Sequence, residues 1–284
     1  MRSMDDLLLQ SGVFPFAAAV LGAGVLRLIA GSKRGPLIAG GAIGIGFLVG
    51  FVLILGAPAR WPLSSSEKLF AIATLATMLG LALDLSRDSP PVTRLLAAVL
   101  PLAALTWVGW SRITGQDWID IASLAAVALG GGFVLTQLFA SGEQATESGI
   151  KLMIACVALA LIAVFGTSAS LGQLAGALAA ATTGFLVWIW PVPRFPFAAA
   201  AVLGGGLTFV ALTGIVAVFT DAPKPALAML LPIFFADLAL SRMPRTQRGL
   251  NRAIRPVLLG AVALIPALAA VGLASLLGSS SGGY

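Results

Sequence analysis

Two acidic residues within the predicted membrane spans of this sequence bear most directly on any chemistry. Asp237 lies in the hydrophobic run 225–241, and Asp84 lies in the run 69–86. An ionisable side chain within a membrane span is costly and is a candidate for a substrate or ion pathway. Asp237 precedes Arg242 by five residues, which places it about 7–8 Å from the end of its run. At that shallow depth we favour a structural role, with the carboxylate reaching water or pairing with a nearby guanidinium.

Paired acids are the other arrangement with catalytic potential. Asp117 and Asp120 are three residues apart, and Asp84 and Asp88 are four apart, so either pair could hold a metal ion. Isolated pairs of this kind are usually solvated helix ends. The absence of histidine excludes a histidine base and histidine-ligated zinc or haem. The single cysteine, Cys156, excludes an intrachain disulfide and an iron–sulfur cluster. We therefore predict no catalytic residue, no metal site and no cofactor, and an enzyme is the less favoured class.

Polar and helix-breaking residues within the hydrophobic runs are further candidates for a solute pathway. Gln137 and Gln173 are the amides expected in or beside the bilayer, where such groups more often join helices than bind a ligand. Pro232 could break a helix and free backbone carbonyls for a substrate. Gly204 begins a glycine triplet that thins its helix. Asp84 is expected to have a local partner in Arg87, which lies three residues further along a helix.

The strongest positive cluster follows the run that contains Asp237. Its five arginines recur at spacings of three and four, which places them on one side of a helical segment. They are Arg242, Arg245, Arg248, Arg252 and Arg255. The simpler interpretation is that they set the membrane topology. The alternative is a docking face for anionic lipid headgroups or an acidic protein partner. We assign the net charge of +6 to topology and expect no nucleic-acid partner.

The composition requires lipid as the solvent for much of the chain. Of 284 residues, 59% are hydrophobic and 10% are charged, whereas a soluble domain has about 25% charged residues. The mean hydropathy is +1.02. We therefore predict an all-α, polytopic transmembrane helical bundle that forms a single integral membrane domain over 1–284 and has no soluble domain.

Hydrophobic runs near the ~20 residues that a span requires define the expected elements. Ten runs fit: 13–31, 36–56, 69–86, 93–110, 119–140, 150–167, 170–190, 195–219, 225–241 and 256–277. The third and sixth are the weakest, so the count falls to eight if both are re-entrant or interfacial. Glycine pairs four residues apart favour close helix packing: Gly40 with Gly44, Gly46 with Gly50, and Gly172 with Gly176. Together with the glycine triplet that begins at Gly204, these pairs make the second, seventh and eighth runs candidates for the centre of the bundle.

The basic residues predict the orientation. Twelve of the 17 fall after the odd-numbered runs and five on the opposite side, which places the odd loops in the cytoplasm and both termini outside. The expected location is a cell membrane, the inner membrane in a bacterium. A weak internal repeat over approximately 13–110 and 170–277 rests on two short similarities. Residues 14–24 recur at 195–206, but a second similarity implies a different symmetry, so the repeat carries little argument.

No motif in the sequence identifies a reaction, a substrate or a family. The favoured function is a transporter or permease for a neutral, amphiphilic or lipid-like solute, because no acid or base is expected at the bilayer centre to carry a coupling ion. The alternative is a non-catalytic, membrane-embedded subunit that acts as a scaffold beside other membrane subunits. A polar cavity beside Gln173 and Gly204 would favour transport, whereas a solidly packed centre with a broad apolar flank would favour the subunit.

Overall fold

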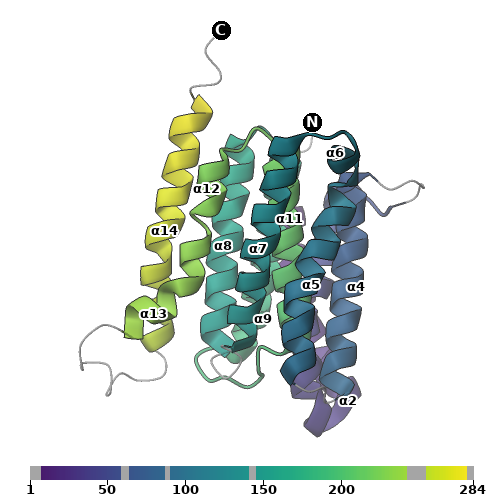
Figure 1. Cartoon of the computed structure of the whole chain (residues 1–284). Helices are drawn as coiled ribbons and strands as arrows, with labels where there is room; N and C mark the ends of the chain where they lie inside the picture. Colours follow the sequence, from purple (N-terminus) through teal and green to yellow (C-terminus); the bar gives the residue numbers. More distant parts are fainter. Residues whose placement is uncertain (1–7, 59–63, 87–89, 141–144, 242–253, 280–284) are drawn as a thin grey trace.

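The computed structural model describes residues 8–58, 64–86, 90–140, 145–241 and 254–279. These residues form helices and their connections and contain no β-strand, which confirms the all-α class for the described part of the chain. Seven helical stretches are long and apolar enough to cross a membrane, as expected of a multi-pass membrane protein. The helices run side by side as one bundle (Figure 1).

Nine longer helices make up the described part of the bundle. They are α2 (Phe14–Ile38), α3 (Ala42–Leu55), α4 (Ser65–Ser86), α5 (Pro90–Val108), α7 (Trp118–Ala140), α8 (Ala145–Phe165), α9 (Ala169–Ile189), α11 (Thr208–Phe219) and α14 (Ile254–Ser279). Short helices complete it: α6 (Trp110–Thr114), α10 (Ala199–Ala201), α12 (Lys224–Ala228) and α13 (Ala236–Ser241). The π-helices η1 (Leu9–Val13) and η4 (Val202–Leu207) and the 3₁₀-helices η2 (Ala39–Gly41) and η5 (Leu231–Phe235) join them.

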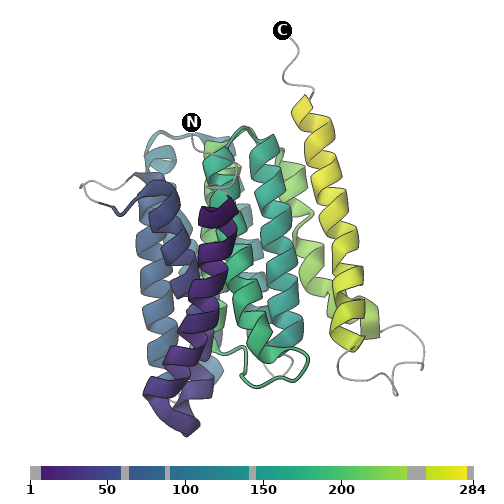
Figure 2. The same cartoon turned by 180° about the vertical axis from the view of Figure 1, so that it is seen from behind.

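The chain reverses direction inside α2. Gly31 has φ +72° and ψ −175°, a conformation that glycine adopts without steric cost. The reversal brings Gly35 so close to Arg27 that the backbone of Arg27 occupies the space of a Cβ on Gly35. Helices α2 and α3 then pack together as a hairpin (Figure 2). The 47-residue stretch Leu9–Leu55 is therefore folded back on itself.

Local capping explains why some helices begin earlier than the hydrophobic runs. The Ser64 N–H donates to Glu67 Oε2 at 2.8 Å, and the Glu67 N–H donates to Ser64 Oγ at 3.2 Å. This reciprocal pair is a capping box, and it starts α4 at Ser65 instead of residue 69. Asp117 caps α7 in the same way, because its Oδ1 accepts the N–H groups of Ile119 and Asp120.

The centre of the bundle is densely packed around η4 and α11. In the stretch Ala199–Phe219, 94% of the most apolar 18-residue segment is buried inside the protein. A Cβ atom added to Gly204 would lie 3.5 Å from the backbone of Gly44. The side chain of Thr77 lies against both glycines. Close approach of this kind between helix backbones is what small residues allow in a membrane. The described residues around Gly204 therefore form a solid centre.

The segment that begins at Lys224 is helical but broken. Helix α12 ends at Ala228, the 3₁₀-helix η5 follows, and α13 resumes α-helical geometry to Ser241. Pro225 and Pro232 stand near the starts of α12 and η5, because a proline fits the first turn of a helix but not its interior. This broken helix packs against α14 and α8 (Figure 1).

Replacement of Gly80 tests the closeness of packing between α4 and α10. An added Cβ would lie 2.6 Å from Ala200 Cα and 2.7 Å from the Ala199 carbonyl oxygen, and neither backbone atom can move aside alone. We expect Gly80→Ala to lower the free energy of unfolding by about 1–3 kcal/mol. Thermal unfolding of the purified protein in detergent measures this.

Gly176→Ala is the matched control, since nothing lies within 4 Å of an added Cβ there. Alanine favours the helix over glycine by about 1 kcal/mol, so this variant is expected to unfold at the same or a higher temperature. Equal losses in the two variants would contradict the packing described for α4.

Candidate functional site

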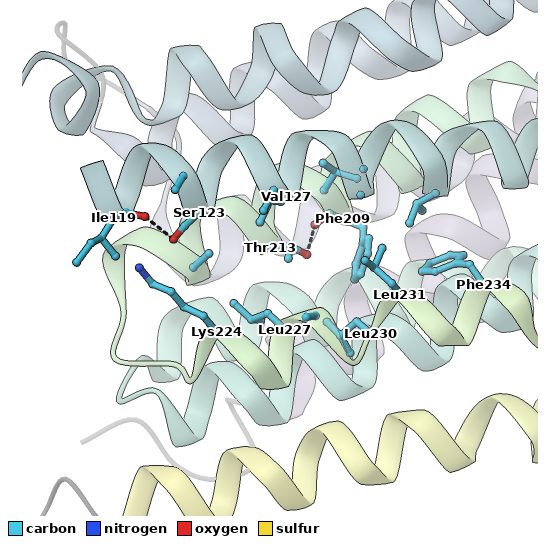
Figure 3. Close-up of a pocket in the computed structure, with 18 of the residues that line it drawn as sticks. Ile119, Ser123, Val127, Phe209, Thr213, Lys224, Leu227, Leu230, Leu231 and Phe234 are labelled. Atoms are coloured by element: carbon cyan, nitrogen blue, oxygen red, sulfur yellow. Dashed lines mark hydrogen bonds between the residues drawn. The ribbon is translucent and has the colours of Figure 1, made fainter. Parts of the chain in front are cut away.

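A groove of about 550 Å³ lies between α7 on one side and the broken helix on the other, with α11 behind it (Figure 3). We call it the α7–α12 groove. Ala126, Val127 and Gly130 line it from α7, Thr213 lines it from α11, and Leu227 and Leu231 line it from the broken helix. Ala126 and Ala228 are exposed on the protein surface. The groove is therefore open along its side and can accept a chain from the surroundings of the bundle.

The walls of this groove offer little polarity. Ser123 donates its hydroxyl to the Ile119 carbonyl at 2.6 Å, and Thr213 donates to the Phe209 carbonyl at 2.8 Å. Both hydroxyls are thus engaged by the backbone one turn earlier, as Figure 3 shows. At one end of the groove Phe209 and Phe234 form an aromatic contact, with ring centroids 6.0 Å apart. The interior suits an alkyl chain better than a polar solute.

Lys224 gives the opposite end a positive charge. It is the only charged residue among the described lining residues, and Figure 3 shows its ammonium directed towards the α7 side near Ser123. Lys224 Nζ lies 3.7 Å from Asp120 Oδ1, and Arg112 Nε lies 3.6 Å from Asp120 Oδ2. Both distances exceed a normal hydrogen bond of about 2.7–3.2 Å. One carboxylate thus faces two cations, and the side chain of Lys224 is 44% exposed.

A buried group of four charged residues lies at the other end of the bundle, where α8 begins. This charge cluster consists of Glu147 and Lys151 of α8, Asp237 of α13 and Arg255 of α14. Lys151 forms an ion pair with Asp237 Oδ2, and its side chain is completely buried. Arg255 Nε lies 3.1 Å from Glu147 Oε1. The cluster ties three helices together across more than one hundred residues of sequence.

One oxygen of each acid in the charge cluster has no hydrogen-bond partner. These atoms are Glu147 Oε2 and Asp237 Oδ1, and both are inaccessible to solvent. The side chain of Glu147 is 6% exposed and that of Asp237 is 25% exposed. A buried acceptor that lacks a donor costs about 1–3 kcal/mol, and more when it is charged. The cluster is therefore balanced in ion pairs but unsatisfied in hydrogen bonds.

Asp84 has a partner that the sequence did not indicate. Its two carboxylate oxygens accept the N–H groups of Ala199 and Ala200, each at 2.9 Å. Asp84 thus caps the start of α10 from a different helix, because the first N–H groups of a helix have no partner within it. Arg87, the neighbour expected to neutralise it, lies outside the described residues.

The remaining predicted pathway residues do not meet at one place. Gln137 and Gln173 are half-buried, on α7 and α9. Pro232 is exposed on η5, whereas Gly204 is buried in η4. None of these four, nor Asp84 or Asp237, lines the α7–α12 groove.

The predicted docking arginines fall mostly outside the described part of the chain. Only Arg255 is described, and it pairs with Glu147. Arg242, Arg245, Arg248 and Arg252 lie outside the described residues. Five of the six predicted packing glycines have a neighbour that an added Cβ would press on, and these are Gly40, Gly44, Gly46, Gly50 and Gly172. Nothing comes within 4 Å at Gly176.

The sequence did not predict the lining of the α7–α12 groove or the buried ion pairs of the charge cluster. The hydrophobic run 150–167 begins one residue before Lys151, so Lys151 is counted with the basic residues at the span ends that set the topology, whereas α8 begins at Ala145. Glu147 and Lys151 are spaced by four residues, which puts them on one face of that helix. This spacing is the feature of the sequence from which the pairing of α8 with other helices could have been predicted.

The acid pair at Asp117 and Asp120 forms a helix cap and ion pairs. No group of three potential metal ligands occurs among the described residues.

Removal of Lys151 tests whether the charge cluster holds the bundle together. Lys151→Met leaves the Asp237 carboxylate without its buried cation, so we expect a loss of about 3–5 kcal/mol in the free energy of unfolding. The double variant Lys151→Met/Asp237→Leu removes both charges and is expected to regain most of it. Denaturant unfolding of the protein in mild detergent measures these differences.

Lys224→Met is the control for the loss of one lysine. Its side chain is 44% exposed and its Nζ lies 3.7 Å from Asp120 Oδ1, so a loss below about 1 kcal/mol is expected. If Lys151→Met costs no more than Lys224→Met, the buried ion pair does not have the structural role assigned to it.

The comparisons with known proteins add no identity to this geometry. No protein-family model matches the chain, and no curated protein shows a significant match to it. Any function must therefore be argued from the α7–α12 groove and the charge cluster themselves.

Proposed function

We propose that the protein moves a single-chain, lipid-like amphiphile across a membrane by way of the α7–α12 groove. The observation that supports this is that the α7–α12 groove has apolar walls and one cation, Lys224, at its end. An alkyl chain would lie against Val127, Leu227 and Leu231, and its polar headgroup would meet Lys224. The area that such a chain buries gives roughly 25 cal/mol per Å² of favourable free energy.

The pairing of Lys224 with Asp120 suits reversible binding. The ion pair between Lys224 and Asp120 is weak, because the ammonium is partly exposed, lies 3.7 Å from the carboxylate and shares that carboxylate with Arg112. A phosphate or carboxylate headgroup could take over this contact at small cost. An amphiphile whose headgroup accepts hydrogen bonds is therefore favoured over a purely apolar solute.

The broken helix is the element that we expect to move. Its three pieces form one wall of the groove, and discontinuous helices line the substrate sites of many transporters. Its lower piece, α13, is held by the Lys151–Asp237 ion pair. We infer that displacement of α12 and η5 changes the width of the groove while α13 stays anchored.

For this function we infer ten passes through the membrane. The seven apolar stretches count the hairpin Leu9–Leu55 once and omit two shorter segments. The hairpin supplies two passes, because 47 residues at ~1.5 Å each exceed twice the ~30 Å hydrocarbon layer. Helix α5 and the broken helix supply the other two. The positive-inside rule then places the Gly31 turn and the charge cluster on the cytoplasmic side of a cell membrane.

The solid packing around Gly204 favours the alternative, a non-catalytic subunit of a larger membrane complex. In that case the α7–α12 groove would receive an apolar helix of a partner. Purification in mild detergent separates the two functions. A transporter is expected as a monomer or homodimer, whereas a subunit is expected to co-purify with unlike chains in a fixed ratio.

Obstruction of the groove tests the proposed transport. We expect the wild-type protein in liposomes to speed the movement of acyl-labelled fluorescent amphiphiles between leaflets, read out by an impermeant quencher. Ala126→Trp places an indole in the groove and is expected to reduce that rate by about tenfold or more, equivalent to ~1.4 kcal/mol or more. The probes are a lysophosphatidic acid, a lysophosphatidylcholine and a monoacylglycerol.

Ala125→Trp is the matched control, since Ala125 is exposed on the same helix but does not line the groove. Its rate is expected to equal that of the wild type. Transport in this form is rejected if the wild-type protein moves none of the three probes faster than protein-free liposomes, or if both tryptophan variants slow it equally.

A further inference from the structure

The charge cluster contains two acids with buried, unsatisfied oxygens, and the proposed transport does not use them. Glu147 and Asp237 each give one oxygen to an ion pair and keep one buried oxygen without a donor. The carboxyl group of Glu147 lies close enough to Asp237 for the two groups to interact. Two carboxylates at such range repel each other unless something positive lies between them.

Among the residues that the structure describes, the charged side chains around the two acids are already engaged elsewhere in the cluster. The charged groups that act on Glu147 are Arg255, Asp237 and Lys151, which come from α14, α13 and α8. Helices α9 and α11 and the 3₁₀-helix η5, which also pack against α8, have no ionisable residue. Helix α12 packs against α8 as well, but its Lys224 faces Asp120 at the other end of the bundle. Arg255 is engaged with Glu147 Oε1 and Lys151 with Asp237 Oδ2.

The four members of the charge cluster differ in their exposure to solvent. Lys151 is completely buried, and Glu147 and Asp237 are largely buried, whereas the side chain of Arg255 is 46% exposed and partly solvated. The interior of the cluster therefore holds two acids and one amine. Each acid is paired with one cation, so the formal charges of the described cluster cancel, and what the two acids lack is a hydrogen-bond donor for their second oxygens.

A proton fits this place better than a metal ion. No group of three potential metal-ligating side chains occurs among the described residues, and two cations already adjoin the acids. A proton needs only two oxygens, because it turns one acid into a donor for the other. That single change satisfies both orphaned acceptors and removes the repulsion.

We propose that Glu147 and Asp237 bind one proton between them, as a carboxylic acid–carboxylate pair that joins α8 to α13. The proton forms an O–H bond on one acid and a hydrogen bond to the other, and its loss returns two facing carboxylates. Deprotonation therefore loosens α13 from α8. Exchange with solvent passes beside Arg255, the exposed member of the cluster. The site stands independently of what the groove binds.

Infrared difference spectroscopy of the protein in lipid nanodiscs tests this site. A pH titration of the wild type is expected to show the C=O band of a protonated, buried carboxylic acid that disappears as the pH rises and shifts in D₂O. Potentiometric titration is expected to give about one proton for that transition. The band is expected to be lost in Glu147→Gln, where the amide supplies the donor to Asp237, and in Asp237→Asn.

Asp120→Asn is the control, because Asp120 is an ion-paired acid at the other end of the bundle. It is expected to leave the band unchanged. A wild-type titration without the band, which needs no variant to fold, would overturn the proposal and leave a bridging water as the donor. A band that persists in both cluster variants would also overturn it. Replacement of choline by Na⁺ at constant pH is expected to leave the band intact, and its loss would assign the site to a cation instead.

Discussion

In hydrocarbon, each backbone N–H and C=O group must find its partner inside the protein, and the rest of this fold depends on that requirement. Helices meet it along their length, but their ends and interruptions do not. The chain departs from regular helix at the Gly31 turn, at η4 and in the broken helix. The start of α10 shows how one such end is handled. Asp84 reaches across from α4 and accepts the two N–H groups that α10 leaves open.

Buried charge obeys the same requirement. Lys151 is buried with its ammonium paired to Asp237, and Glu147 is paired to Arg255. Such pairs need not add stability compared with an apolar core, but the loss of one partner is expensive. They therefore act as a constraint on which helices meet, and in this bundle they specify that α8, α13 and α14 converge at one end. The upper end has the weaker version, in which Asp120 faces two exposed cations.

Composition and the hydrophobic runs predicted the all-helical class and a multi-pass membrane protein, because these are properties of single segments. Helix ends were less accessible, since they depend on caps such as the pair of Ser64 and Glu67. The start of α8 shows what such an error costs. With the boundary five residues late, at 150, Lys151 falls at the end of its span and Glu147 falls outside it, which hides the charge cluster. The partner of Asp84 was beyond reach for another reason, because the contact joins residues 115 positions apart. The α7–α12 groove likewise arises from helices that no local pattern brings together.

The reversal at Gly31 has a consequence for how the chain is built. The arms on either side of the turn meet through residues close in the sequence, as the contact between Gly35 and Arg27 illustrates. Local contacts of this kind form early, because little loop-closure entropy opposes them. Chains also fold from the N-terminus while they are being made. The first hairpin is therefore able to assemble during translation and offer a finished surface, onto which α9 later docks through the hydrogen bond from Trp188 to the Val20 carbonyl.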